Sequence, residues 1–126
     1  MIPGSEGSIP AIAGVLAAFR AHGRPIVHVI RLYDADGGNA ELPRRTLVAI
    51  GGPVVRPGCD GSQLRAELHP PGRGFRLDAE LLAGGGLQEV GPNEWVMYKP
   101  RWGAFYETPL GPHLCACGVD SVAVSC

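Results

Sequence analysis

The stretch WVMYKPRWGAF, residues 95–105, decides the fold. Its first four residues predict a strand, which ends at Lys99 in a loop that contains proline and glycine. Residues 105–117 then predict a helix with Pro109 in its first turn. A strand that leads through a loop into a helix puts Lys99 at the carboxyl end of a sheet, where ligands bind in open α/β sheets. Lys99 is therefore a candidate ligand-site residue, and a solvated loop lysine is the alternative.

Two further segments predict strands. Residues 26–32 are rich in β-branched side chains and almost continuously apolar, which is typical of a parallel strand buried on both faces. Residues 119–124 predict a last strand, after a helix that ends at Gly118. Because strands alternate with helices, the order favours right-handed βαβ units. The predicted fold class is α/β, with a parallel sheet of about three strands. A family resemblance, described below, implies that this sheet is Rossmann-like and doubly wound.

A helix is predicted before the first of these strands. Its apolar residues recur at the spacing of one helical face: Ile12, Val15, Leu16 and Phe19. Gly23 suits the end of this helix. Residues 1–7 are expected to form a flexible lead, that is, an N-terminal segment without regular structure. No strand-like segment precedes the helix.

The middle of the chain carries weaker signals. A helical turn is expected within residues 41–50, and short helices are expected at 62–68 and 77–82. With 126 residues, the chain is expected to form one domain at most, over residues 1–126.

The composition excludes several classes of protein. The formal net charge is -1, so no basic face indicates a nucleic-acid partner. No apolar run approaches the roughly 18 residues of a membrane span, and the first residues do not resemble a secretory signal. We therefore expect a cytoplasmic protein with no nucleic-acid partner and no membrane partner. Its four cysteines should be reduced thiols.

A zinc site is the alternative role for those cysteines. The conceivable ligands are His113, Cys115, Cys117 and Cys126. A C-x-C spacing is tighter than that of zinc knuckles, and no second pair follows. We expect no metal and no cofactor. His28, inside an apolar strand, is expected to be a core histidine held by a hydrogen bond.

Several segments, taken in order, resemble the isochorismatase-like cysteine hydrolases. Residues 10–29 resemble the first helix and second strand of that family, and residues 36–41 resemble the loop that follows. The most specific match is YKPRWGAF, residues 98–105, with Thr108 and Leu110 after it. Residues 114–124 resemble the helix and strand that lead to the catalytic turn. The resemblance implies a doubly wound sheet and an Asp-Lys-Cys catalytic group, in which the cysteine thiolate attacks an amide-type carbonyl.

Only the lysine of that group transfers to this sequence, at Lys99. The family aspartate belongs to a strand before the first helix, and Asp34 and Asp36 follow the second strand instead. The family cysteine lies several residues beyond a glycine whose place is taken here by Ser125. Cys126 is therefore not expected to be the nucleophile.

The sequence thus predicts an isochorismatase-like hydrolase acting on a C–N bond of a small amide or urea-type substrate. The chain is expected to be a fragment, incomplete at both ends and inactive as given. If completed, its partner would be a small-molecule substrate, and we expect a homo-oligomer. The alternative is a non-catalytic remnant, or a binding or structural module with a hydrolase-like core. The residues do not identify the substrate.

Overall fold

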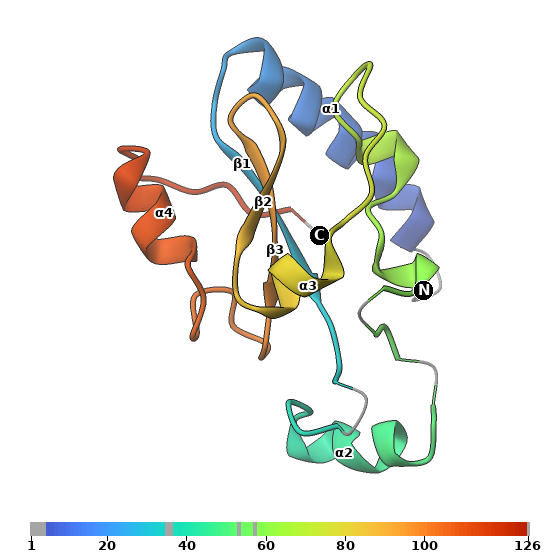
Figure 1. Cartoon of the computed structure of the whole chain (residues 1–126). Coiled ribbons are helices and arrows are strands. Elements are labelled where there is room, and N and C mark those ends of the chain that lie inside the picture. Colours follow the sequence, from blue (N-terminus) through green and yellow to red (C-terminus); the bar gives the residue numbers. More distant parts are fainter. Residues whose placement is uncertain (1–4, 35–36, 53, 57, 126) are drawn as a thin grey trace.

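The computed structural model describes residues 5–34, 37–52, 54–56 and 58–125, and Figure 1 shows its arrangement. Three strands form one sheet, with helices on both of its faces and a long connection that projects away from it. The elements, in chain order, are η1 (Ser5–Ser8), α1 (Ile9–Ala21), β1 (Ile26–Arg31), α2 (Leu42–Ala49), η2 (Asp60–Ser62), η3 (Ala66–Leu68), α3 (Ala79–Ala83), β2 (Leu87–Gly91), β3 (Glu94–Lys99) and α4 (Leu110–Ala116).

The sheet is mixed, with the strand order β1-β3-β2. β1 and β3 run parallel, so that Ile26 pairs with Glu94 and Arg31 pairs with Lys99. β2 and β3 are antiparallel neighbours joined by a tight turn, in which Asn93 has a positive φ of 54°. The register of this hairpin shifts between Glu89 and Gly91. Only β1 and β3 therefore carry the parallel pairing that the sequence predicts.

The two faces of the sheet carry different helices. On one face, Leu82 of α3 packs with Val90, Val96 and Tyr98 of β2 and β3 in the main apolar core. α1 also lies on this side, because its Arg20 reaches Glu94 of β3. On the other face, the ring of Trp95 meets His113 of α4 edge to face, with 4.4 Å between ring centroids. Coverage of both faces confirms the α/β class.

Local signals place the first helix well. Pro10 lies in the first turn of α1, where its missing N–H leaves no bond unmade. Gly23 has a φ of +59°, and the Arg24 N–H donates to the Phe19 carbonyl. A left-handed residue after the last turn is the usual way for a helix to end, and glycine adopts it without strain.

Several of the predicted elements are confirmed with small changes. α2 occupies most of the expected 41–50 turn, and α3 lies within two residues of the expected 77–82 helix. The helix expected at 105–117 is shorter, because α4 begins only after Pro109. The helix expected at 62–68 is wrong: the segment holds the end of η2 and the separate turn η3. Of the expected flexible lead 1–7, residues 1–4 lie outside the described part and Ser5 begins η1.

Two predictions about strands are wrong. Residues 119–124 form no strand: they leave α4 as an extended, exposed segment in which Val124 is 87% exposed. A β-branched sequence becomes a strand only beside a partner that takes up its hydrogen bonds, and these residues lie in no ladder. The second error is the omission of β2, whose polar residues and glycine hid it. It is stabilised by pairing with the strongly apolar β3.

Among the described residues, no helix is both long and apolar enough to cross a membrane.

Candidate active site

Lys99 lies where the sequence predicts, at the carboxyl end of β3 and opposite the last residue of β1. It is the single lysine of the chain. Its Nζ donates a hydrogen bond of 2.7 Å to the Trp102 carbonyl, so the side chain folds back over its own loop. The position of the ammonium group therefore depends on the conformation of residues 99–102.

A second loop, after β1, meets the Lys99 loop at the Asn39 carbonyl. Arg31 donates to this oxygen through Nη2 at 2.7 Å, and Arg101 donates to it through Nη1 at 3.0 Å. Arg31 also donates to the Leu32 carbonyl, and its guanidinium lies 4.2 Å from the centroid of the Tyr33 ring. The Asn39 carbonyl thus connects the carboxyl end of β1, through Arg31, with the loop after β3, through Arg101.

Glu41 balances part of this positive charge. Its carboxylate accepts from Arg31 Nη2 at 3.2 Å. Burial by itself would raise the pKa of Glu41. The hydrogen bonds that the carboxylate accepts from its own backbone and from Arg31, together with the charge of Arg101, outweigh this and lower it. The group of Arg31, Glu41, Lys99 and Arg101 keeps a net positive charge, which suits an anionic substrate group or reaction intermediate.

A shallow hollow adjoins this group. It is lined by Glu41, Arg101, Trp102, Gly103 and Tyr106. Trp102 is 60% exposed and Tyr106 is 56% exposed, so both rings are available for contact with another molecule. The sequence pattern had pointed to Lys99 in this loop and gave no role to the aromatic residues.

No base or nucleophile accompanies Lys99 in the described part of the chain. Lys99 forms no ion pair there with a carboxylate and no hydrogen bond with a thiol. Asp34 is exposed after β1, where its N–H is bound by the Asn39 side chain. Cys59 is exposed in the long connection. Asp36 and Cys126 lie outside the described residues.

Of the conceivable zinc ligands, His113, Cys115 and Cys117 lie within the described residues and Cys126 lies outside them. Cys115 and Cys117 are exposed free thiols, and the Cys117 sulfur lies 3.7 Å from Nε2 of His113. Across the described residues, no group of three or more histidine, cysteine or acidic side chains has the geometry to hold a metal ion.

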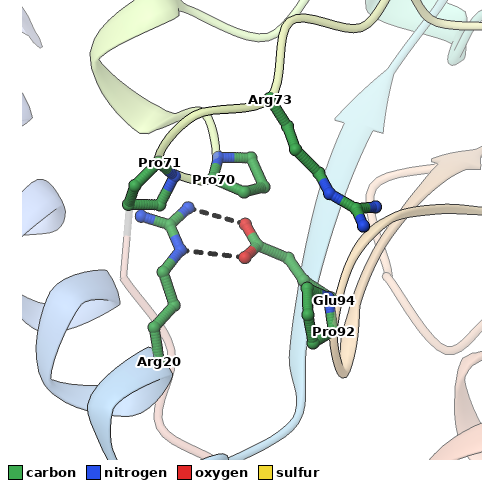
Figure 2. Close-up of a pocket in the computed structure, with 6 residues that line it drawn as sticks. All are labelled: Arg20, Pro70, Pro71, Arg73, Pro92 and Glu94. Carbon is green, nitrogen blue, oxygen red and sulfur yellow. Dashed lines mark hydrogen bonds and ion pairs between the residues drawn. The ribbon is translucent and has the colours of Figure 1, made fainter.

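A second charged cluster lies at the opposite, amino end of β3. Figure 2 shows Arg20 of α1 reaching the Glu94 carboxylate with two parallel hydrogen bonds. Their lengths are 2.8 Å from Nε and 2.7 Å from Nη2, and Nη2 also donates to the Leu68 carbonyl. His28 of β1 lies 2.7 Å from Oε1 of Glu94. Because a carboxylate only accepts, the histidine Nε2 carries the proton of this bond.

The surroundings set the protonation states of this cluster. Burial lowers the pKa of His28, against the opposing hydrogen bond to Glu94. Burial would raise the pKa of Glu94, but the hydrogen bonds from Arg20 and His28 outweigh it and lower the pKa. At neutral pH the cluster therefore holds a charged Arg20, a charged Glu94 and a neutral His28. The expectation that His28 is a hydrogen-bonded core residue is confirmed.

A small cavity of about 250 Å³ opens beside this pair. Its walls are Pro70, Pro71 and Pro92, and Arg73 enters it from the other side of Glu94 (Figure 2). Glu94 is 1% exposed, and Arg20 and His28 occupy both of its oxygens. The arrangement holds α1 to the sheet, and it lies at the end of the strands away from Lys99.

Sequence reasoning missed the partners at both ends of the sheet. Arg20 and Glu94 are 74 positions apart, and Arg101 and Asn39 are 62 apart. One signal was present: Glu94 and His28 are polar residues within otherwise apolar strands, and buried polar groups nearly always have partners.

Comparison with known proteins gives one informative match. No protein-family model matches the chain, and no curated protein matches it. Among solved structures, it is similar to the crystal structure of an isochorismatase family protein from Desulfovibrio vulgaris subsp. vulgaris str. Hildenborough. The sequences are 31% identical and the TM-score is 0.68. The match covers 95% of this chain and 56% of that protein.

The chain therefore spans little more than half the length of the protein that it matches. Together with the mixed α/β architecture, this match shows that this chain has an isochorismatase-like fold.

Proposed function

We propose that this chain provides the core of a cysteine hydrolase that acts on the C–N bond of a small amide or urea-type substrate. The observation that carries the proposal is the position of Lys99, at the carboxyl end of a parallel strand in an isochorismatase-like fold. Active sites of open α/β sheets form at this edge. The net positive charge of the surrounding group supports the same role.

The positive charge of Lys99 would stabilise the negatively charged species of this reaction. An ammonium group beside a thiol lowers the thiol pKa, and it stabilises the oxyanion that forms when the thiolate adds to a carbonyl carbon. The aspartate would take the thiol proton and then give it to the leaving nitrogen as the C–N bond breaks. Water then hydrolyses the thioester, or for a urea the thiocarbamate, that remains on the cysteine. The acid and the thiolate must be supplied at Lys99 by an aspartate and a cysteine.

We further propose that the 126 residues alone are inactive. In the described part of the chain, neither an aspartate nor a cysteine contacts Lys99. Nucleophile, base and charge-stabilising group act as a unit, so a lysine without the other two accelerates little. The purified chain is expected to hydrolyse small amides and ureas no faster than a free thiol at the same concentration. Robust turnover that Cys126→Ala abolishes would contradict this and make Cys126 the nucleophile.

The proposal is tested most directly with a longer product of the same gene region. The flanking DNA, read in all frames, should encode an apolar strand ending in Asp before residue 1 and a Cys beyond residue 126. A chain that includes both should hydrolyse an amide or urea, and Lys99→Met should abolish the activity. Absence of both segments would favour the alternative, a non-catalytic module with a hydrolase-like core.

Three accompanying proposals concern the setting of the protein. We propose a cytoplasmic location, which the exposed free thiols Cys59, Cys115 and Cys117 support, because such thiols persist where the medium is reducing. We propose a homo-oligomer, since within the described residues β1 is the edge strand of the sheet and its apolar residues suit a strand inside a sheet. We propose no nucleic-acid partner, given a net charge of -1.

A further inference from the structure

We infer that Arg101 is a positioning residue for Lys99, acting through the Asn39 carbonyl. The inference rests on the proposed function only for the role of Lys99; the geometry is independent of it. Arg101 lies between Lys99 and Trp102, the residue whose carbonyl accepts the Lys99 hydrogen bond. Its guanidinium crosses to the other loop and donates to Asn39 at 3.0 Å. The hydrogen bond between Arg101 and Asn39 therefore holds the backbone at residues 101–102, which includes the Trp102 carbonyl that accepts from Lys99.

The acceptor is itself held in place. The Asn39 side chain accepts from the Asp34 N–H at 2.9 Å and donates to the Leu32 carbonyl at 3.1 Å. The next residue, Ala40, is 1% exposed and packs with Tyr33 and Val48. The Asn39 carbonyl is thus a fixed point on the carboxyl side of β1 rather than part of a freely moving loop.

Arg31 strengthens this fixed point. It stands opposite Lys99 in the parallel register and donates to the same Asn39 oxygen at 2.7 Å. Hydrogen bonds from charged donors are roughly twice as strong as neutral ones. Two of them converge on one oxygen, so the ends of β1 and β3 are joined beyond the last pair of the ladder. Without Arg101, the Lys99 loop loses its hydrogen bond to the loop that follows β1.

The single lysine permits a direct test. Reductive methylation with ¹³C-formaldehyde labels Lys99 and the N-terminal amine, whose resonances are resolved from each other. In the unaltered chain, the dimethyl-Lys99 resonance should differ in shift from that of free Nα-acetyl dimethyl-lysine. In Arg101→Gln most of this difference should be lost, because the ammonium group leaves the Trp102 carbonyl. Arg101→Lys keeps a charged donor of similar reach but adds a second labelled lysine, whose resonance is assigned in the double variant Arg101→Lys/Lys99→Met. The remaining Lys99 resonance should then retain part of the difference.

Arg45 provides the matched control. Its Nε donates to the Ala40 carbonyl at 3.3 Å, one residue from Asn39, but Arg45 belongs to α2 and not to the loop that holds Lys99. Arg45→Gln removes a comparable hydrogen bond and should leave the Lys99 resonance unchanged. Equal shifts in Arg45→Gln and Arg101→Gln would overturn the inference, and so would an unchanged resonance in Arg101→Gln. The readout needs no substrate, so it stands or fails separately from the hydrolase proposal.

Discussion

The two ends of the β1–β3 pair both gather charged side chains, yet the clusters differ in how completely they are paired. At the amino end, Arg20 and His28 both bind the Glu94 carboxylate, which is 1% exposed. At the carboxyl end, the hydrogen bonds that Arg101 and Lys99 form within the described residues go to backbone carbonyls, and two exposed aromatic rings stand beside them.

This difference separates a structural cluster from a candidate site. Charges that neutralise one another inside the protein hold elements together and have little left for a ligand. Cations that rest on neutral carbonyl groups keep their charge available to an incoming anion. The amino end should therefore determine stability and the carboxyl end function.

The largest expected effect is at the amino end. Glu94→Gln leaves the Arg20 guanidinium, which is 18% exposed, without its carboxylate. Breaking one side of a buried pair destabilises a protein by about 3 kcal/mol or more. Urea denaturation should show this loss. The control is Glu67→Gln, whose ion pair with Arg65 is about half exposed and should matter little. Equal midpoints for the two variants would show that the amino end is not structural.

A smaller effect is expected from pH at the same end. The pKa of His28 lies below its ordinary 6.5 in the folded protein, so the unfolded chain binds a proton there more readily. Stability is thus fully present above pH 6.5 and falls as the pH drops below it. Glu94, with a pKa below its ordinary 4.5, continues the loss in stronger acid.

The measurement is the urea midpoint at about pH 8 and about pH 5.5. His28→Gln keeps a donor near Glu94 but does not titrate, so the difference between the two midpoints should shrink. His22→Gln is the control, because that exposed histidine binds only the Ala18 carbonyl of its own helix. A difference that stays the same in His28→Gln would assign the pH dependence to another group.

The smallest effect on stability is expected at the carboxyl end. Lys99→Met removes the candidate catalytic ammonium but only one hydrogen bond to a backbone oxygen. The free energy of unfolding should change by about 0.5 kcal/mol or less, as for most substitutions outside a core. A loss as large as that of Glu94→Gln, measured in the same urea titration, would make Lys99 structural and remove the contrast between the two ends.

Sequence reasoning predicted the parts of the fold that local signals determine. The helix that ends at Gly23 and the strands β1 and β3 were visible from glycine placement and apolar runs. The burial expected for β1 on both faces was wrong, because only Ile26 of this strand is buried and its other residues are half-buried. Lys99 was visible because strand and loop signals meet at one residue. Contacts between distant segments were not visible: nothing in the composition near Arg20 or Arg101 indicates a partner more than 60 positions away.

The two strand errors have a common physical origin. A strand forms from its neighbour's hydrogen bonds as much as from its own residues. Residues 119–124 have strand-like composition and no ladder, and β2 has an unremarkable composition and a strong partner. Strand propensity predicts neither the absence of a strand at 119–124 nor the presence of β2, because it does not include pairing with a neighbouring strand.

The two strand pairs of the mixed sheet differ in the loop-closure entropy that is lost when they form. Forming the β2–β3 hairpin brings together Gly91 and Glu94, close neighbours in the chain, whereas forming the parallel pair brings together residues 26 and 94. Closing the longer loop costs about 3 kcal/mol more, since the separation differs by between four and five doublings. This additional entropic cost belongs to the docking of β1 on β3. Because β1 is the strand that aligns Arg31 with Lys99, the candidate site is assembled only when this long-range closure is complete.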